Sequence, residues 1–273
     1  MINRSYKLLV VDIDGTLLGK DGNILPEDRQ ALAEACDLGI KVSLSTGRAA
    51  QACLSIISQL ALDSYHTFFE GALVSNPADN EEVYVQPLSK AVVKQAVEFA
   101  HLNDINIDLY STTHYFVERE TWSSKVHRDF FSIQPTVVDF TKLWERERII
   151  KGGLVATSPQ EAAKARDFHL RFNDSLHFSW VTTPAYPGVD FINIVAPGVS
   201  KGKALKALAS HLGIPLTEVI AIGDGTNDIP LLSLAGLGIA MGNAPAEVKA
   251  AADYITLDVN RGGIAAAIKK FLL

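Results

Sequence analysis

Four aspartates stand at or shortly after the ends of two short runs of apolar residues. Asp12 and Asp14 follow the first run, and Asp224 and Asp228 follow a run near the other end of the chain. An Asp-Gly pair by itself most often marks a turn. If both runs are strands of one parallel sheet, however, their carboxyl ends meet at the edge where such folds bind ligands. Carboxylates gathered there would repel one another, by about 3 kcal/mol for a pair about 5 Å apart at an effective dielectric constant of ~20.

A positive group must therefore lie among these acids. A site that offers only a few oxygen ligands favours Mg²⁺, which shares its coordination with the phosphate of a substrate. Lys201 and Lys203 fall in the first turn of a helix expected from Ser200, where cations are unfavourable unless an anion binds nearby. Thr46 and Gly47 follow a second strand candidate, residues 40–45. Taken together, and in this order, these residues predict a joint site for a divalent cation and a phosphate.

Strands alternate with helices in both end regions of the chain, which indicates a parallel sheet. Gly and Pro mark the ends of several elements, as where Pro26 opens a helix and Gly39 closes it. The fold class expected is therefore α/β, with a doubly wound, Rossmann-like parallel sheet as its core. The expected strands span residues 7–11, 40–45, 219–222 and 238–241, and further helices span 49–60, 200–212 and 230–235.

The middle of the chain has a different composition. Residues 84–193 hold all three Trp and nine of the twelve Phe, but only three of the nineteen Gly. Apolar and polar residues alternate over 105–109 and 176–180, which is typical of half-buried antiparallel strands. We therefore expect an inserted α/β cap domain with an antiparallel sheet. The cap is expected over 84–193, with helices at 89–102 and 159–172, and the core domain over the two flanking segments, 1–83 and 194–273.

Composition excludes several classes of protein. The chain has 273 residues, 48% hydrophobic and 21% charged, which is typical of folded globular proteins. A net charge of −6 argues against a broad nucleic-acid surface. No apolar run approaches the ~18 residues of a membrane span, and two Cys are too few for a disulfide framework. A cytoplasmic monomer or homodimer, without nucleic-acid or membrane partners, is expected.

Four stretches resemble the motifs of the haloacid dehalogenase-like (HAD) superfamily of aspartate-nucleophile phosphatases. The match to its Cof-type branch, subclass IIB, rests on Ala240–Ala244 and on the large insertion. Two positions depart from that branch: Glu70 stands where Asn usually precedes Gly-Ala, and Arg261 stands where an acidic residue is commoner. The four stretches are Val10–Leu17, Ser45–Arg48, Ser200–Leu205 and Gly223–Asp228.

This resemblance implies a Mg²⁺-dependent phosphatase that hydrolyses small phosphomonoesters, either a sugar phosphate or a cofactor phosphate, through an aspartyl-phosphate. Asp12 would be the nucleophile and Asp14 the general acid and base. The catalytic set is Asp12, Asp14, Thr46 and Lys201; the metal set is Asp12, Asp14, Asp224 and Asp228; the substrate and phosphate set is Gly47, Arg48, Glu70, Gly71 and Asn227.

Three alternatives stay open at this stage. A phosphotransferase or mutase would use the same aspartyl-phosphate, and a non-catalytic regulator would keep the phosphate site without turnover. A signalling receiver also gathers acids, a Thr and a Lys around Mg²⁺. Against the receiver, this chain has a second acid two residues beyond Asp12 and carries the insertion over 84–193.

Overall fold

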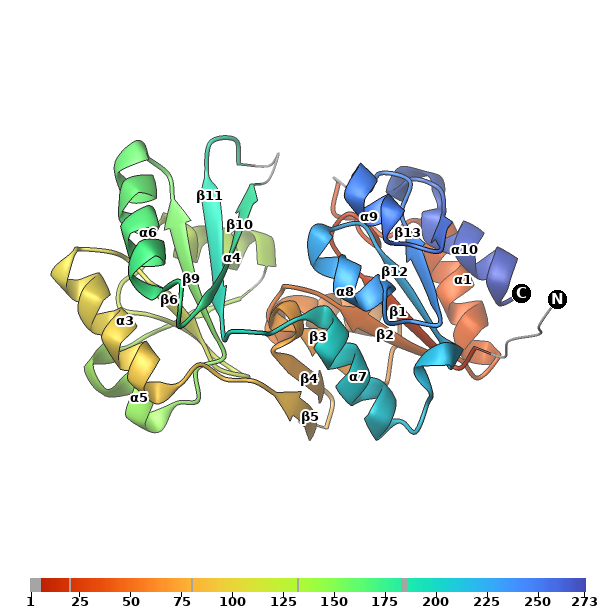
Figure 1. The fold of residues 1–273 in the computed structure, drawn as a ribbon, viewed down its shortest axis with the longest axis horizontal. Coiled ribbons are helices and arrows are strands. Elements are labelled where there is room, and N and C mark those ends of the chain that lie inside the picture. Colours follow the sequence, from red (N-terminus) through yellow and green to blue (C-terminus); the bar gives the residue numbers. More distant parts are fainter. Residues whose placement is uncertain (1–5, 20, 80, 132, 183–185) are drawn as a thin grey trace. The chain divides into compact units, whose positions relative to one another are not determined.

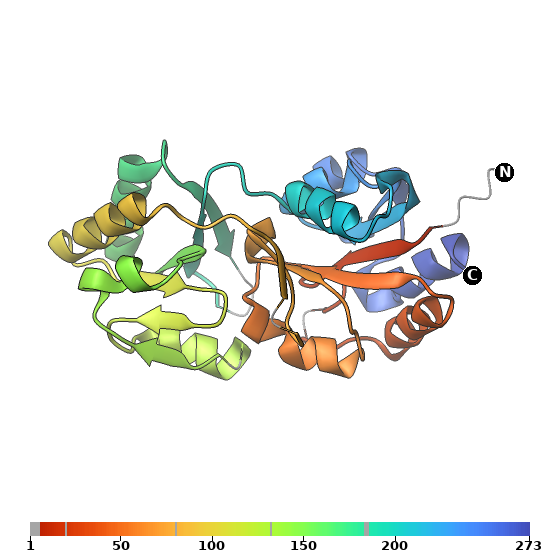
Figure 2. The same cartoon turned by 90° about the horizontal axis from the view of Figure 1, so that it is seen from below.

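The structure is a computed structural model that describes residues 6–19, 21–79, 81–131, 133–182 and 186–273 (Figures 1 and 2). The chain divides into two compact units, each with its own sheet. The inserted unit takes in Val85–Val199, where the sequence analysis expected 84–193, and the short stretch Ala49–Ala52 joins it. The first unit comprises Met1–Arg48, Cys53–Tyr84 and Ser200–Leu273.

The first unit is built on a sheet with the strand order β14-β13-β12-β1-β2-β3-β4-β5. Strand β1 lies in the middle and pairs in parallel with β2 and β12, which confirms the doubly wound parallel core. Strands β3 and β4 pair antiparallel, a departure that the sequence analysis did not predict. The strands are β1 (Leu8–Asp12), β2 (Lys41–Ser45), β3 (His66–Phe68), β4 (Leu73–Asn76), β5 (Glu81–Val85), β12 (Val219–Gly223), β13 (Leu237–Ala240) and β14 (Tyr254–Ile255).

Helices cover both faces of this sheet. Figures 1 and 2 show α1 and α10 on one face and α7 on the other. Every residue of β1 is buried, as expected for a central strand covered on both sides. Leu8 and Val10 belong to the same apolar cluster as Leu205 and Leu208 of α7. The helices are α1 (Pro26–Asp37), α2 (Leu54–Gln59), α7 (Lys201–His211), α8 (Ile229–Leu232), α9 (Ala246–Ala250) and α10 (Gly263–Phe271).

The second unit has a mostly antiparallel sheet with the order β10-β11-β9-β6-β7-β8. Only β7 and β8 pair in parallel among the strand pairs described for it. The expected antiparallel sheet of the insertion is therefore confirmed in the main. Its elements are α3 (Lys90–Leu102), β6 (Asp108–Tyr110), β7 (Tyr115–Val117), α4 (Trp122–Phe131), β8 (Pro135–Val137), α5 (Leu143–Arg146), β9 (Lys151–Ala156), α6 (Pro159–Phe172), β10 (His177–Thr182) and β11 (Asp190–Val195).

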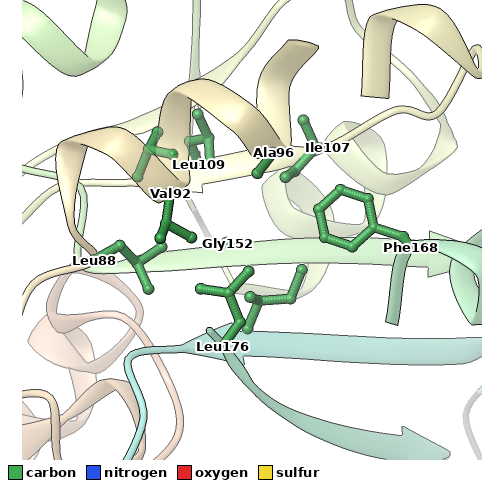
Figure 3. Close-up of a pocket in the computed structure, with 10 residues that line it drawn as sticks. Leu88, Val92, Ala96, Ile107, Leu109, Gly152, Phe168 and Leu176 are labelled. Atoms are coloured by element: carbon green, nitrogen blue, oxygen red, sulfur yellow. The ribbon is translucent and has the colours of Figure 1, made fainter. Parts of the chain in front are cut away.

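The two faces of the second sheet differ in character. Apolar side chains such as Leu109, Phe168 and Ile194 fill the side of α3 and α6, around a cavity of about 10 Å³ (Figure 3). A cavity of that size without polar partners does not hold a ligand. The other face is polar where α4 packs: Ser123 donates a hydrogen bond to Asp108 at 2.7 Å. The apolar cavity is therefore a feature of the packing of this unit and not a binding site.

A buried carboxylate joins the two helices on one face of the first sheet. Asp28 of α1 is fully buried, and its Oδ1 accepts the N–H of Ala265 in the first turn of α10 at 2.7 Å. Its Oδ2 has no hydrogen-bond partner among the described residues. Burial raises the pKa of Asp28 to about 6, although the N–H of Ala265 opposes this. Asp28 therefore caps α10, but its ionised form is poorly solvated.

We expect this group to make stability depend on pH. The folded-state pKa of Asp28, about 6, lies above the usual value of 3.8, so folding favours the protonated carboxyl. Stability from this group is present below pH about 4 and is lost as the pH rises through 6. As the pH rises from 4 to 7, the free energy of unfolding of Asp28→Asn, measured in urea, should increase by on the order of 1–3 kcal/mol relative to that of the unmodified protein. The exposed Asp37→Asn is the control, and a pH-independent difference for Asp28→Asn would contradict this assignment.

Candidate functional site

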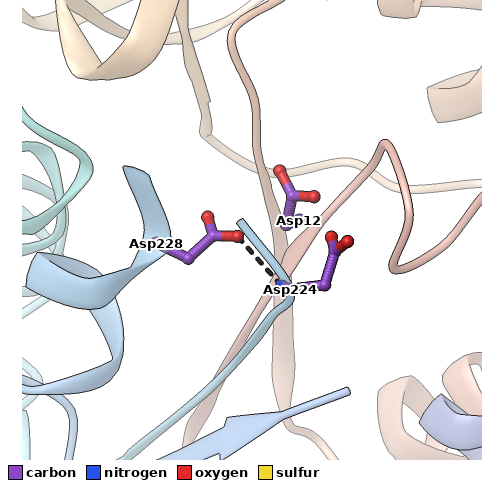
Figure 4. A group of neighbouring side chains, drawn as sticks. All are labelled: Asp12, Asp224 and Asp228. Carbon is purple, nitrogen blue, oxygen red and sulfur yellow. Dashed lines mark hydrogen bonds between the residues drawn. The ribbon is translucent and has the colours of Figure 1, made fainter. Parts of the chain in front are cut away.

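Three carboxylates meet at the carboxyl edge of the first sheet. Asp12 is the last residue of β1, and Asp224 directly follows the neighbouring parallel strand β12. Asp228 lies in the short helix Thr226–Asp228 just beyond. One oxygen from each of the three lies within 4.8 Å of the others (Figure 4). The structure therefore brings together three of the four aspartates that the sequence analysis placed at this edge.

A buried ammonium lies between two of these carboxylates. Nζ of Lys201 donates to Oδ1 of Asp12 and to Oδ1 of Asp228, each at 2.6 Å. Lys201 is the first residue of α7, whose N-terminus is capped by Ser200 through the N–H of Lys203. The Lys201 side chain is 1% exposed, so its charge is stabilised mainly by these two carboxylates, with a smaller contribution from Glu70.

Backbone groups fix the orientation of Asp228. Its Oδ2 accepts the N–H groups of Asp224 at 3.0 Å and Gly225 at 2.9 Å. A Cβ at Gly223 would lie 2.6 Å from Cγ of Asp228, so only glycine leaves room for this carboxylate. Both oxygens of Asp228 are thus held in place: one accepts from Lys201, and the other accepts from the loop that carries Asp224.

Asp224 is positioned by two further side chains. Oγ1 of Thr16 donates to its Oδ1 at 2.9 Å, and Nδ2 of Asn243 lies 3.3 Å from its Oδ2. Asn243 also donates to the carbonyl of Gly15 at 2.8 Å and accepts the N–H of Val259 at 2.9 Å. The sequence analysis gave Asn243 no role. The signal available was its place in Ala240–Ala244, the stretch typical of the Cof-type branch.

The cluster carries more negative than positive charge. Burial raises the pKa of Asp12 well above its usual value, and Asp228 adds to this while Lys201 opposes it. Burial also raises the pKa of Asp224 to about 6. Burial disfavours the charged form of Lys201, but attraction to Asp12 and Asp228 outweighs it, and the pKa of Lys201 is raised. Three carboxylates facing one ammonium, with oxygen as the only donor element, are a chemical match for a hard divalent cation.

Asp14 stands apart from this cluster. Nε of Arg48 donates to its Oδ2 at 2.8 Å and Nη2 to its Oδ1 at 2.5 Å, which is a bidentate ion pair. The Asp14 side chain is 60% exposed, whereas that of Arg48 is 12% exposed. The sequence analysis expected Arg48 to contact substrate and did not predict this pair. Asp14 therefore lies at the rim of the site, with both carboxylate oxygens held.

The remaining candidate residues lie in three segments that contact one another: the turn at Thr46, the loop at Glu70 and the short helix that contains Asn227. The carbonyl of Thr46 accepts the N–H of Glu70 at 3.1 Å. Nδ2 of Asn227 donates to Oε2 of Glu70 at 2.7 Å. A Cβ at Gly71 would collide with the carbonyl oxygen of Ser200, so this glycine lets its loop approach the start of α7. Glu70 thus contacts both Thr46 and Asn227, and Gly71 lies against the start of α7.

Removing the Lys201 ammonium should destabilise the fold. In Lys201→Met, Asp12 and Asp228 lose the cation that compensates their buried charges, and breaking a buried pair in this way costs about 3–5 kcal/mol. The measurement is the free energy of unfolding in urea, without added divalent cation. Lys203→Met, on the exposed side of the same helical turn, is the matched control and should change stability by less than about 0.5 kcal/mol. A similar value for both variants would contradict the inferred compensation.

Known proteins share both the sequence and the fold. A phosphatase of Bacillus subtilis is 29% identical, with 97% of this chain and 100% of that protein covered. The 5-amino-6-(5-phospho-D-ribitylamino)uracil phosphatase of the same organism is 29% identical, with 98% and 96% covered. These relatives confirm the expectation of a phosphoric monoester hydrolase. No helix within the described ranges is both long and apolar enough to cross a bilayer.

Solved structures agree with these relatives. A haloacid dehalogenase-like hydrolase from Bacteroides thetaiotaomicron has a TM-score of 0.83 and 27% identity, and 97% of this chain and 99% of that chain are covered. A sugar phosphatase of HAD subclass IIB has a TM-score of 0.78 and 26% identity, with 97% and 98% covered. The family model of the haloacid dehalogenase-like hydrolases matches residues 9–268. The resemblance seen in the four motifs is thereby confirmed, and the chain belongs to the haloacid dehalogenase-like hydrolase family.

Proposed function

We propose that this hydrolase is a magnesium-dependent phosphatase that cleaves small phosphomonoesters through a phosphoaspartate on Asp12. The observation that carries the proposal is the placement of Asp12: its carboxylate contacts the Lys201 ammonium and lies beside Asp224 and Asp228. A nucleophile there has a fixed cation and two further carboxylates beside it. Relatives named as phosphatases of a phosphoribityl compound and of sugars support a sugar phosphate or cofactor phosphate as substrate.

The acidic cluster fits the divalent cation that this chemistry needs. Side-chain oxygens of Asp12, Asp224 and Asp228 would hold Mg²⁺ together with the main-chain carbonyl of Asp14. When bound, the cation supplies charge neutralisation for the phosphoryl group. Thr16 and Asn243 would keep Asp224 in place for that purpose, because both already contact its carboxylate.

The chain's own residues account for both steps of hydrolysis. In the first, a carboxylate oxygen of Asp12 forms a bond to phosphorus while the bond from phosphorus to the leaving oxygen breaks, and Asp14 gives that oxygen a proton. In the second, Asp14 takes a proton from water as the water oxygen attacks phosphorus, which frees phosphate and restores Asp12. Lys201 and the Thr46–Gly47 turn would hold the phosphoryl oxygens, and Asn227 would help to orient them.

Arg48 gains a role in this scheme that differs from substrate contact. Because its guanidinium holds both oxygens of Asp14, the carboxyl must leave this ion pair before it can donate a proton to the leaving group. Arg48 would thus hold Asp14 at the rim between turnovers. On leaving the ion pair, Asp14 would take up a proton from solvent before giving it to the leaving oxygen, and the proton taken from water in the second step would pass to solvent when the pair re-forms. Glu70 and Gly71 would contact the substrate directly.

Exchange of the nucleophile is the first test. Release of inorganic phosphate from a panel of phosphomonoesters should require Mg²⁺ and should fall by at least about 1,000-fold in Asp12→Asn, because an amide cannot form the covalent intermediate. Asp37→Asn, an exposed change at the end of α1, serves as the control. Turnover in Asp12→Asn at the level of the unmodified enzyme would rule out the covalent route.

Exchange of Asp14 tests its proposed role as the general acid. Asp14→Asn should slow hydrolysis of alkyl phosphates by about 100-fold or more, since their leaving alkoxides need a proton. Hydrolysis of p-nitrophenyl phosphate should fall by a clearly smaller factor, because its phenolate leaves without one. The comparison is of kcat for the two classes on one enzyme preparation. Equal losses on both would remove Asp14 from the proton transfer to the leaving group.

A further inference from the structure

Glu70 is held in an unusual backbone conformation. Its φ is 59°, and its neighbours Phe69 and Gly71 have φ values of 52° and 101°. Residues other than glycine rarely adopt this left-handed region, and they persist there only where the surroundings impose it. Here the N–H of Phe69 donates to the carbonyl of Arg48 at 3.0 Å, and that of Glu70 donates to Thr46 at 3.1 Å. The loop is therefore fixed against the Thr46–Arg48 turn.

This conformation directs the Glu70 carboxylate to a specific place. Its Oε2 accepts a hydrogen bond from Nδ2 of Asn227 at 2.7 Å. Its Oε1 lies so close to the α-carbon of Gly47 that a Cβ at that position would collide with it. The carboxylate thus bridges Gly47 and Asn227, the two positions that the proposed function assigns to the phosphoryl group.

The neighbouring cations offset the charge of Glu70 only in part, because Lys201 attracts it while contacting two other carboxylates. Lys201 contacts Asp12 and Asp228, and Arg48 holds both oxygens of Asp14. The partner of the Glu70 carboxylate in its own hydrogen bond is a neutral amide, which leaves the negative charge in place. An anion on the substrate next to the reacting phosphate would therefore meet a carboxylate.

We propose that Glu70 selects the leaving group of the substrate by charge: it accepts hydrogen bonds from a hydroxyl or ammonium group near the ester oxygen and rejects a carboxylate or a second phosphate there. This rests on the proposed phosphatase function and deepens it by naming the substrate class. Like charges about 5 Å apart at a half-exposed site should lower the affinity for the anionic ligand by roughly ten- to a hundredfold.

Three phosphomonoesters with the same two-carbon skeleton test this selection. They are 2-hydroxyethyl phosphate, 2-aminoethyl phosphate and phosphoglycolate, which differ in a neutral, cationic or anionic terminal group. The readout is the inhibition constant of each compound against hydrolysis of p-nitrophenyl phosphate, with saturating Mg²⁺. In the unmodified enzyme, phosphoglycolate should bind at least about tenfold more weakly than the other two.

Two variants separate charge from shape. Glu70→Gln keeps an oxygen for Asn227 but removes the charge, so the discrimination against phosphoglycolate should shrink at least about fivefold. Glu70→Asp keeps the charge and tolerates the left-handed backbone, so most of the discrimination should remain. Because each ratio compares ligands on one preparation, a partly inactive variant does not alter it. Glu247→Gln, exposed on α9, is the matched control.

Each result has one interpretation. If the inhibition constants of phosphoglycolate and 2-hydroxyethyl phosphate have the same ratio in Glu70→Gln and in the unmodified enzyme, charge selection by Glu70 is overturned. The phosphatase function would still stand. Failure of all three compounds to compete overturns it in the same way, because the terminal group would then not reach Glu70. Absence of any Mg²⁺-dependent hydrolysis of p-nitrophenyl phosphate would overturn the proposed function itself, and the selection with it.

Discussion

One buried ammonium among three carboxylates sets the conditions for the rest of the first unit. Lys201 balances only some of the charge that Asp12, Asp224 and Asp228 bring to the edge of the sheet. Such a cluster is stable only if the chain holds each carboxylate by other hydrogen bonds or if a further cation joins it. Burial raises the pKa values of Asp12 and Asp224, and the neighbouring carboxylates add to this. A divalent cation would offset the remaining negative charge, and this is the role that the proposed function gives it.

The geometry of the sheet explains why residues so distant in sequence share this cluster. Strand β1 lies between β2 and β12 and runs parallel to both, so Asp12, Thr46 and Asp224 leave the sheet at the same edge. The apolar strands need only be buried to place these ends together, and burial of Leu8 and Val10 against α7 does this. Hydrophobic packing thereby fixes the position of polar groups that would separate if they were free.

Sequence reasoning succeeded where position follows from strand order, and it failed where position follows from side-chain direction. Asp12, Asp224 and Lys201 could be placed because strand ends and helix starts fix them. The Asp14–Arg48 pair and the contact between Glu70 and Asn227 could not, because each depends on the path of a loop. For Glu70 that path includes a left-handed residue, which no local pattern predicts for glutamate. The antiparallel pairing of β3 and β4 was missed because each strand is too short to show a period of two.

The two acids of the first motif illustrate how environment separates the roles of identical side chains. Asp12 ends a central strand and is buried beside an ammonium, so its carboxylate is held rigidly, as the proposed nucleophile must be. Asp14, two residues later, has left the strand and is exposed, so in the proposed mechanism its carboxylate would exchange Arg48 for a substrate oxygen. A group with the role proposed for Asp14 gives and takes a proton within one turnover and needs this freedom, since each step presents it with a different partner. The difference between a fixed and a movable carboxylate therefore follows from where β1 ends.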